Sequence, residues 1–178
     1  KENVELAPWA DVVYGCDAAW WRNVAGLPTF KGLKISQDNM LAGRYRDLHL
    51  ITVIAKSNDM LFEQPGVIGA GGNSGHQALN LAAQFGAKRI MLIGYDAHGR
   101  SGLHWYGRNQ GNGRNNPTED QFRRWIAALD GSARVLELRG IDVVNTSRIS
   151  EVRCFRRQDL ELTLEQWGLV GATDICRV

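Results

Sequence analysis

Hydrophobic and polar positions are most regularly spaced between residues 67 and 96. The apolar positions recur at steps of three and four residues: Ala78, Leu79, Ala82, Ala83 and Phe85. This spacing predicts an amphipathic helix, and Gln77 and Asn80 fall outside its apolar stripe. Gly86 is placed to end the helix. The continuous apolar run at residues 90–93 then predicts a buried strand of a parallel sheet, which runs toward Asp96.

A glycine-rich turn precedes this helix. Its glycines are Gly69, Gly71, Gly72 and Gly75. They allow positive φ angles and close approach of the backbone, so the turn can present N–H groups at the positive end of the helix. Such a turn suits an anion, most often a phosphate. The alternative is a helix that Asn73 or Ser74 caps, with glycines that only shape the turn.

Strands and helices also alternate elsewhere in the chain. The other predicted elements are a strand over residues 10–15 that leads to Asp17, a helix ended by Gly26, a strand over 33–36 that leads to Asp38, a strand over 48–55, a helix from Thr118 that Gly131 interrupts, a helical continuation over 133–139, a strand over 141–145 and a helix over 159–167. This alternation indicates one α/β domain, with a mostly parallel sheet flanked by helices. Ligands of such sheets bind beyond the carboxyl ends of the strands, so Asp17, Asp38 and Asp96 would lie at the crevice.

Residues 97–117 are polar and rich in glycine and asparagine, and they are too many for a simple connection in a compact domain. Because they follow the strand that leads to Asp96, we interpret them as a substrate loop or lid. His104 is the natural general base, since an unperturbed imidazole has a pKa of about 6.5. His98 is the reserve candidate. Packing within the loop is the alternative role for His104 and for Tyr106.

The composition is that of one soluble globular domain, with 44% hydrophobic and 22% charged residues among 178. A net charge of +2 does not by itself indicate nucleic-acid binding. Three widely spaced cysteines indicate neither a disulfide framework nor a zinc site. No apolar run approaches the ~20 residues of a membrane span. We therefore expect a cytoplasmic protein without a membrane partner. Self-association into a homo-oligomer stays open.

Two familiar motifs are absent from the turn. Ser74 stands where the dinucleotide fingerprint needs its third glycine, which disfavours NAD chemistry. Ser74 also lacks the spacing of a hydrolase nucleophile elbow, so an esterase is not expected.

Several segments together resemble a group of Rossmann-like proteins. They are GCDAAWW, GGNSGHQALNLAAQFGAKRIMLIGYD, the downstream His104 and VVNTS. The group contains bacterial family 42 sialyltransferases, motility accessory factors, archaeal 6-hydroxymethylpterin diphosphokinases and similar uncharacterised phage proteins. The likeness covers residues 8–155, and its specific part runs from Gly69 to Asp96. It implies a single Rossmann-like domain that binds a nucleotide-activated donor, CMP-sugar or ATP, and transfers a glycosyl or pyrophosphoryl group.

The resemblance also implies roles for individual residues. Asn73, Ser74 and Gly75 match the start of the family's phosphate-side helix, where the amides of Gly71 and Gly72 would also face the donor phosphate. His104 matches a histidine that follows the acid Asp96, and both would serve catalysis. Apart from the resemblance, Asp17 and Asn145 could contact the nucleotide, and Tyr106 could stack on its base or sugar. Capping of a helix or strand end is the alternative for Asp17 and Asn145. The three acids Asp17, Asp38 and Asp96 would suit Mg²⁺.

These families usually open with a strand and a Gly-Pro-Ser turn, whereas the printed sequence starts at Lys1 without them. We therefore expect either a domain without its first strand or an incomplete donor site. Two other function classes stay open. One is a non-catalytic phage or assembly protein that keeps the scaffold and presents Trp9, Trp20 and Trp21 to a partner. The other is a nucleic-acid-binding module, which the small net charge disfavours.

Overall fold

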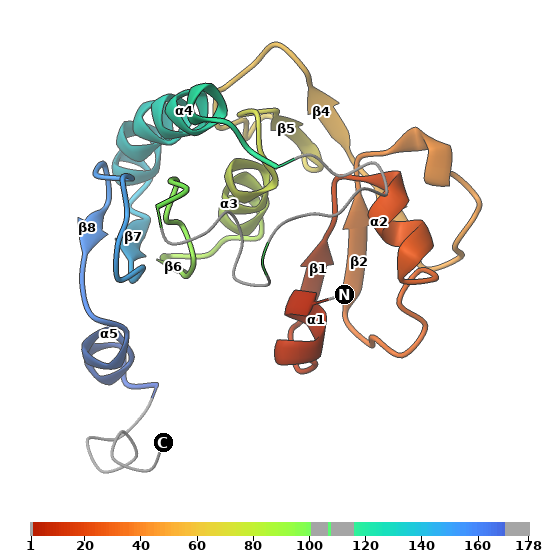
Figure 1. The fold of residues 1–178 in the computed structure, drawn as a ribbon, viewed down its shortest axis with the longest axis horizontal. Coiled ribbons are helices and arrows are strands. Elements are labelled where there is room, and N and C mark those ends of the chain that lie inside the picture. Colours follow the sequence, from red (N-terminus) through yellow and green to blue (C-terminus); the bar gives the residue numbers. More distant parts are fainter. Residues whose placement is uncertain (1, 101–106, 108–115, 170–178) are drawn as a thin grey trace.

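The computed structural model describes residues 2–100, 107 and 116–169, which form helices and short strands (Figure 1). All strand pairs within this part of the chain are parallel. The predicted α/β class with parallel pairing is therefore confirmed. Among the described residues, none of the helices combines the length and the hydrophobicity that a bilayer span requires.

The first sheet forms from two ladders. Strands β1 (Val12–Tyr14), β2 (Leu33–Ser36) and β3 (Leu48–Leu50) pair in that order, and β4 (Thr52–Ile54) pairs with β5 (Val67–Gly69). Only Ile51 separates β3 from β4, and its N–H donates to the Ser36 carbonyl at 2.9 Å. The next N–H, of Thr52, donates to the Gly66 carbonyl at 2.9 Å. Since successive amides of a strand point to opposite edges, residues 48–54 are one strand between β2 and β5. The predicted strand over 48–55 is confirmed.

The second sheet contains β6 (Arg89–Leu92), β7 (Asp142–Asn145) and β8 (Arg156–Arg157). None of the described strands pairs across from one sheet to the other. One edge each of β1, β5, β6 and β8 thus has no strand partner in the part of the chain that the structure describes. The parallel architecture is established, and the finer Rossmann-like assignment stays a prediction.

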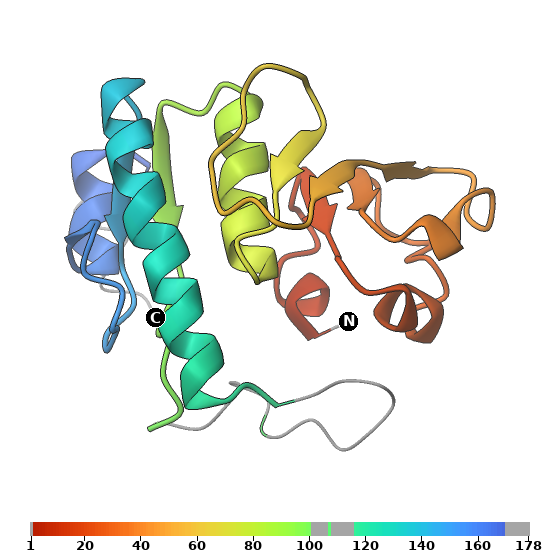
Figure 2. The ribbon, with the colours of Figure 1, turned by 90° about the horizontal axis from the view of Figure 1, so that it is seen from above.

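Helix α3 (Ser74–Gln84) lies between the two sheets in both views (Figure 1, Figure 2). Its Leu79 packs in the core with Leu92 of β6. Its Leu81 packs in a separate cluster with Ile35 of β2. Burial of each leucine side chain stabilises the fold by about 1.5–3 kcal/mol. The helix predicted from the hydrophobic pattern therefore packs in the cores of both sheets.

Helix α2 (Ala18–Asn23) covers the face of the first sheet that α3 does not cover. Val13 packs with the α2 cluster around Trp21, whereas the next residue, Tyr14, packs in the α3 cluster. Neighbouring strand residues point to opposite faces, so the sheet has a helix on each side. Trp21 is 0% exposed, with Trp20 edge-on against it. Trp21 therefore cannot belong to the partner surface expected for a non-catalytic protein.

The remaining described helices are α1 (Glu2–Leu6), the 3₁₀ turn η1 (Asn39–Leu41), α4 (Glu119–Leu138) and α5 (Leu160–Gln166). Helix α4 begins at Thr118, whose hydroxyl accepts from the Gln121 N–H while the Gln121 side chain accepts from the Thr118 N–H. This capping box confirms the predicted start. The predicted interruption at Gly131 is wrong, because α4 continues through it without a break.

Polar side chains of α3 are buried, which the hydrophobic pattern did not predict. The Asn80 carboxamide accepts from the Leu61 N–H at 3.0 Å and from the Gly69 N–H at 3.3 Å, and it donates to the Leu61 carbonyl at 2.9 Å. One turn later, Gln84 donates to the Leu61 and Val67 carbonyls. The two amides thus satisfy the backbone of the segment that leads into β5. Phe85, expected in the apolar stripe, is 56% exposed.

Candidate functional site

The glycine-rich turn is a tightly packed connection between β5 and α3. Gly71 and Gly72 have φ angles of +54° and +74°, which favour glycine. A Cβ on Gly71 would lie 2.0 Å from Cγ of His76, so the histidine ring packs directly under the turn. Gly69 has an ordinary φ, but a Cβ there would lie 2.2 Å from the Asp59 carbonyl oxygen. Positive φ is therefore confirmed at Gly71 and Gly72, and close approach of the backbone at Gly69 and Gly71.

Some amides of the turn have partners within the protein. The N–H groups of Ala70 and Gly71 donate to the Ser57 carbonyl at 2.8 and 3.3 Å. Asn73 is the N-cap of α3, and its Oδ1 accepts from the His76 N–H at 2.9 Å. The capping role considered for Asn73 is thus real.

Four further amides are left without a protein acceptor in the described residues: Gly72, Asn73, Ser74 and Gly75. Gly72 and Ser74 are exposed. The last three of these N–H groups belong to the first turn of α3, where the helix dipole adds a positive potential. These are the amides predicted to face a donor phosphate, and none of the described residues provides an acceptor for them.

A cavity of about 460 Å³ adjoins the turn at Gly72. It is lined by Gln37, Asn39, Ile51, Thr52, Val53, Ala55, Ala70, Gly72 and Gln77. Gln37 follows the carboxyl end of β2 and Ala55 follows that of β4, so the cavity lies where parallel sheets bind ligands. Its volume is in the range of small-molecule sites.

The polar wall of this cavity is a short hydrogen-bonded chain. The Tyr14 hydroxyl donates to Gln77 Oε1 at 2.9 Å, and Gln77 Nε2 donates to Gln37 Oε1 at 3.4 Å. Burial is the main reason why the pKa of Tyr14 is raised well above its usual value, with Cys16 and Asp17 as further causes. Tyr14 is thus a neutral donor that orients Gln77. The two carboxamides suit hydrogen bonding to a base or a sugar.

The end of β6 is tied to the turn by Tyr95. Its hydroxyl donates to the Gly75 carbonyl at 2.9 Å, and its ring would lie 3.2 Å from a Cβ on Gly75. Burial raises the pKa of Tyr95 to about 12, so it stays a hydrogen-bond donor. The next residue, Asp96, is exposed, and its carbonyl accepts from the Glu151 N–H at 2.9 Å. The predicted proximity of this strand end to the α3 turn is therefore supported by the Tyr95 contact.

The predicted acids at the ends of β1 and β2 have other roles. Asp38 caps η1 and α2, because its two carboxylate oxygens accept from the N–H groups of Met40 and Ala18 at 3.0 Å each. Asp17 is the N-cap residue of α2 but makes no side-chain cap bond. Burial raises the pKa of Cys16 to about 12, and the Asp17 carboxylate adds to this.

No group of three potential metal ligands occurs among the described residues. The described part of the chain therefore does not bring Asp17, Asp38 and Asp96 together. The Mg²⁺ ion that the resemblance implied stays a prediction.

Asn145 is buried, and its side chain shapes the loop after β7. Its Oδ1 accepts from the Ser147 N–H at 3.0 Å, and its Nδ2 donates to Ser150 Oγ at 3.0 Å. At 0% exposure it has no surface for a nucleotide. The alternative role at the strand exit is therefore the one that the structure shows.

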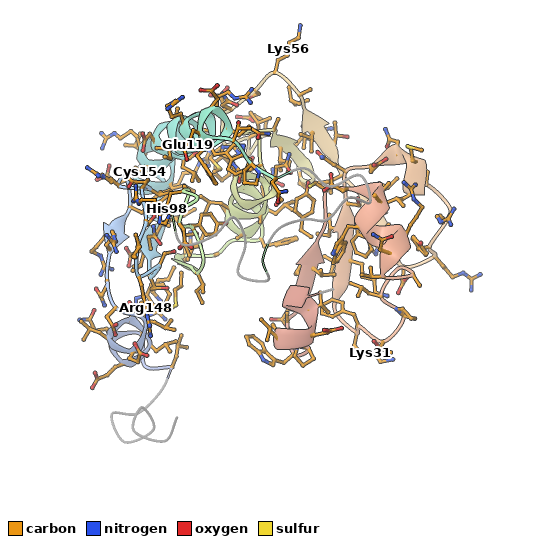
Figure 3. The ribbon with its side chains drawn as sticks, in the orientation of Figure 1. Lys31, Lys56, His98, Glu119, Arg148 and Cys154 are labelled. Carbon is orange, nitrogen blue, oxygen red and sulfur yellow. The ribbon has the colours of Figure 1, made fainter. Side chains whose placement is uncertain are left out.

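His98 lies at the second sheet, well apart from β1 and β2 (Figure 3). It is 7% exposed, and its Nδ1 accepts from the Arg100 N–H at 3.1 Å. Its Nε2 is buried and has no partner within the described residues. His104, Tyr106 and most of the proposed lid lie outside the described residues, so their roles stay predictions.

Three polar residues of the cavity were missed by the sequence analysis: Gln37, Asn39 and Gln77. Gln37 and Asn39 flank Asp38, and of these three residues the sequence pattern indicated only Asp38 as a site residue. The sequence does carry a signal for Gln37 and Asn39, because polar residues directly after the carboxyl end of a parallel strand lie where such sheets bind ligands. Gln77 was placed outside the apolar stripe, and no helical period distinguishes a solvated glutamine from one that faces a cavity.

Comparison of the chain with models of known protein families, with curated proteins and with solved structures finds no match.

Proposed function

We propose that this chain binds the phosphate of a nucleotide-activated donor at the start of α3 and transfers a glycosyl or pyrophosphoryl group. One observation carries the proposal. The N–H groups of residues 72–75 lack protein acceptors in the described part of the chain, and they open beside a cavity of about 460 Å³ at the carboxyl ends of parallel strands. A phosphate would complete the first turn of the helix, while the base or sugar would occupy the cavity.

The fixed amides also suit a transfer reaction. As the bond to the leaving phosphate breaks, negative charge grows on its oxygens, and N–H dipoles that are already oriented stabilise this charge. Gln77 and Gln37 would hold the remainder of the donor. His104 is retained as the proposed general base for the acceptor hydroxyl, and Asp96, at the neighbouring strand end, as the proposed residue that orients the acceptor.

Asn73 offers a sharp test, because two replacements keep its cap. Asn73→Asp preserves a good N-cap but adds a negative charge beside the phosphate, whereas Asn73→Ser preserves the cap without charge. We expect Asn73→Asp to weaken donor binding about tenfold, near 1.4 kcal/mol, and Asn73→Ser to change it little. Calorimetry with CMP, CDP, ATP and nucleotide-sugars, with Mg²⁺ present, measures both.

Two outcomes would reject the proposal. The first is no binding of any of these nucleotides to the wild-type chain. The second is equal affinity of the wild-type and Asn73→Asp proteins, which would put the phosphate elsewhere. If nucleotides bind but no transfer is detected in the presence of acceptors, the site is a binding site and the transferase part of the proposal fails.

A further inference from the structure

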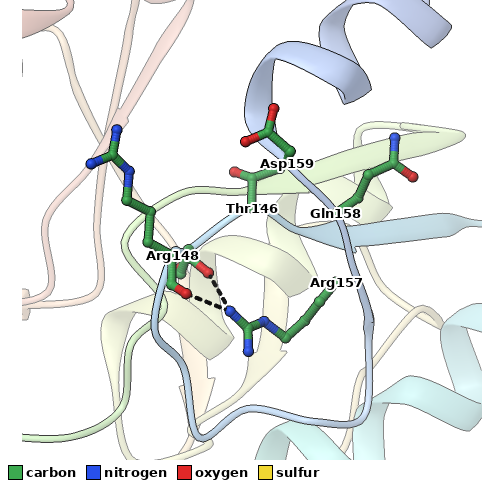
Figure 4. Close-up of a pocket in the computed structure, with 6 residues that line it drawn as sticks. Thr146, Arg148, Arg157, Gln158 and Asp159 are labelled. Atoms are coloured by element: carbon green, nitrogen blue, oxygen red, sulfur yellow. Dashed lines mark hydrogen bonds between the residues drawn. The ribbon is translucent and has the colours of Figure 1, made fainter.

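A second cavity lies at the carboxyl ends of β7 and β8 (Figure 4). Its volume is about 350 Å³, and it shares no lining residue with the cavity beside α3. It is lined by Thr146, Ser147, Arg148, Arg157, Gln158 and Asp159. The proposed function does not use any of these residues.

Arg157 is held in place by the main chain. Its Nη2 donates to the Ser147 carbonyl at 3.1 Å and to the Arg148 carbonyl at 2.6 Å. These bonds fix the plane of the guanidinium, and Nε and Nη1 are left without acceptors in the described residues. A guanidinium that is already ordered loses less conformational entropy when an anion binds to it.

Arg148 supplies a second guanidinium at the same cavity. Its side chain is exposed and extends away from that of Arg157 (Figure 4). None of the described carboxylates forms an ion pair with it within 4.0 Å. One arginine is thus fixed and the other is free to close on a ligand.

The other polar side chains of the cavity are engaged in local structure. Asp159 is the N-cap of α5, where its Oδ1 accepts from the Glu161 and Leu162 N–H groups at 3.0 and 3.2 Å. These amides are the main reason why the pKa of Asp159 lies below its usual value, and Arg148 adds to the effect. Gln158 donates to Gln166 at 2.9 Å. With two arginines and one aspartate, the lining has a formal charge of +1.

We propose that this cavity binds a small oxyanion, the carboxylate or phosphate group of a metabolite, between Arg148 and Arg157. The planar fork of a guanidinium matches the paired oxygens of both groups. The position at the carboxyl ends of parallel strands agrees with this role. The site is independent of the one beside α3.

Titration followed by ¹H–¹⁵N NMR tests the site, with sodium phosphate in one series and sodium acetate in another, each against sodium chloride at equal ionic strength. We expect saturable shifts of Arg157 Nε–H and of the amides of residues 146–159. Saturation by only one of the anions assigns the ligand as a phosphate ester or a carboxylate. The absence of saturation with both anions would overturn the proposal.

Arg148 is the side chain to replace, because no described group forms a hydrogen bond or ion pair with its guanidinium. We expect Arg148→Ala to weaken anion binding at least tenfold and Arg148→Lys to weaken it less, because lysine keeps the charge but not the fork. Arg124→Ala, which removes an exposed arginine of α4, is the control for net charge and should bind like the wild type. Equal binding by wild type and Arg148→Ala, or equal loss in Arg124→Ala, would overturn the proposal.

Discussion

At the scale of the residue, Gly71 shows how closely the turn is fitted to the helix beneath it. Gly71→Ala places a methyl group against the His76 ring and in a left-handed conformation. Strain and overpacking together should lower the free energy of unfolding by about 3 kcal/mol. Gly86→Ala is the matched control, since φ is +86° there but nothing lies within 4 Å of a Cβ. Urea unfolding should show a loss of only about 1 kcal/mol for this control.

His76 makes stability depend on pH. It is 0% exposed, and its Nε2 lies 3.0 Å from the Asn58 carbonyl oxygen and 3.1 Å from Ser132 Oγ. Burial is the main cause that holds the pKa of His76 below 6.5, against the opposing effect of the Asn58 carbonyl. Below pH ~6.5 the unfolded chain binds a proton that the folded protein does not. The free energy of unfolding therefore falls as the pH decreases from about 6.5 toward the lowered pKa.

Urea unfolding at pH 7.5 and 5.5 measures this dependence. Acidic groups with a lowered pKa, such as Asp159, lose their contribution mainly below pH ~5, outside this window. The decrease between the two pH values should be smaller in His76→Gln than in the wild type. An unchanged decrease in that variant would assign the effect to another group.

At the scale of the element, hydrophobic period and turn residues predicted most of the helices and strands. The strand at residues 33–36 and the cap at Thr118 are where the sequence placed them. The error at Gly131 arose because glycine weakens a helix without forbidding it, and the capping box and buried Leu129 outweigh that weakness. The short β8, by contrast, has no hydrophobic pattern and exists only because β7 pairs with it.

Gly131 can therefore be replaced. It is exposed in the interior of α4, and a Cβ added there would have nothing within 4 Å. Gly131→Ala should raise the free energy of unfolding by about 0.5–1 kcal/mol, because alanine loses less backbone entropy in a helix. Gly140→Ala just beyond the same helix should lower it, since φ is +67° there. Thermal unfolding of the two variants should shift in opposite directions.

The candidate site was predictable only in part for a related reason. Glycines and a helix start are local features, so the amides of residues 72–75 could be located from the sequence. Whether a polar side chain faces a ligand or caps a backbone group depends on tertiary neighbours. Asp38 and Asn145 both accept hydrogen bonds from backbone amides. Gln77 instead accepts from the Tyr14 hydroxyl, and this bond holds it in the cavity wall.

At the scale of the whole molecule, α3 is shared by the cores of both sheets, which are not hydrogen-bonded to each other in the described residues. Its amide side chains also serve the segment that enters β5. Asn80 alone makes three hydrogen bonds to that backbone. The two halves of the molecule therefore share one helix of 11 residues. Met60 and Phe62, from the segment that leads into β5, also pack in the core of the second sheet.

We expect the contacts of α3 with the segment before β5 to set the order in which these parts fold. Asn80 and Gln84 reach the segment that leads into β5 from one side only once a helical turn has aligned them, so the helix should form in the transition state and the β5 segment should dock afterwards. Ala82→Gly within α3 should then slow refolding, whereas Asn80→Ala should chiefly accelerate unfolding. Stopped-flow chevrons measure both arms, and a φ-value near one at Asn80 would reverse the order. The hydrogen bonds of Asn80 and Gln84 would thus stabilise the native topology after the rate-limiting step rather than guide the chain to it.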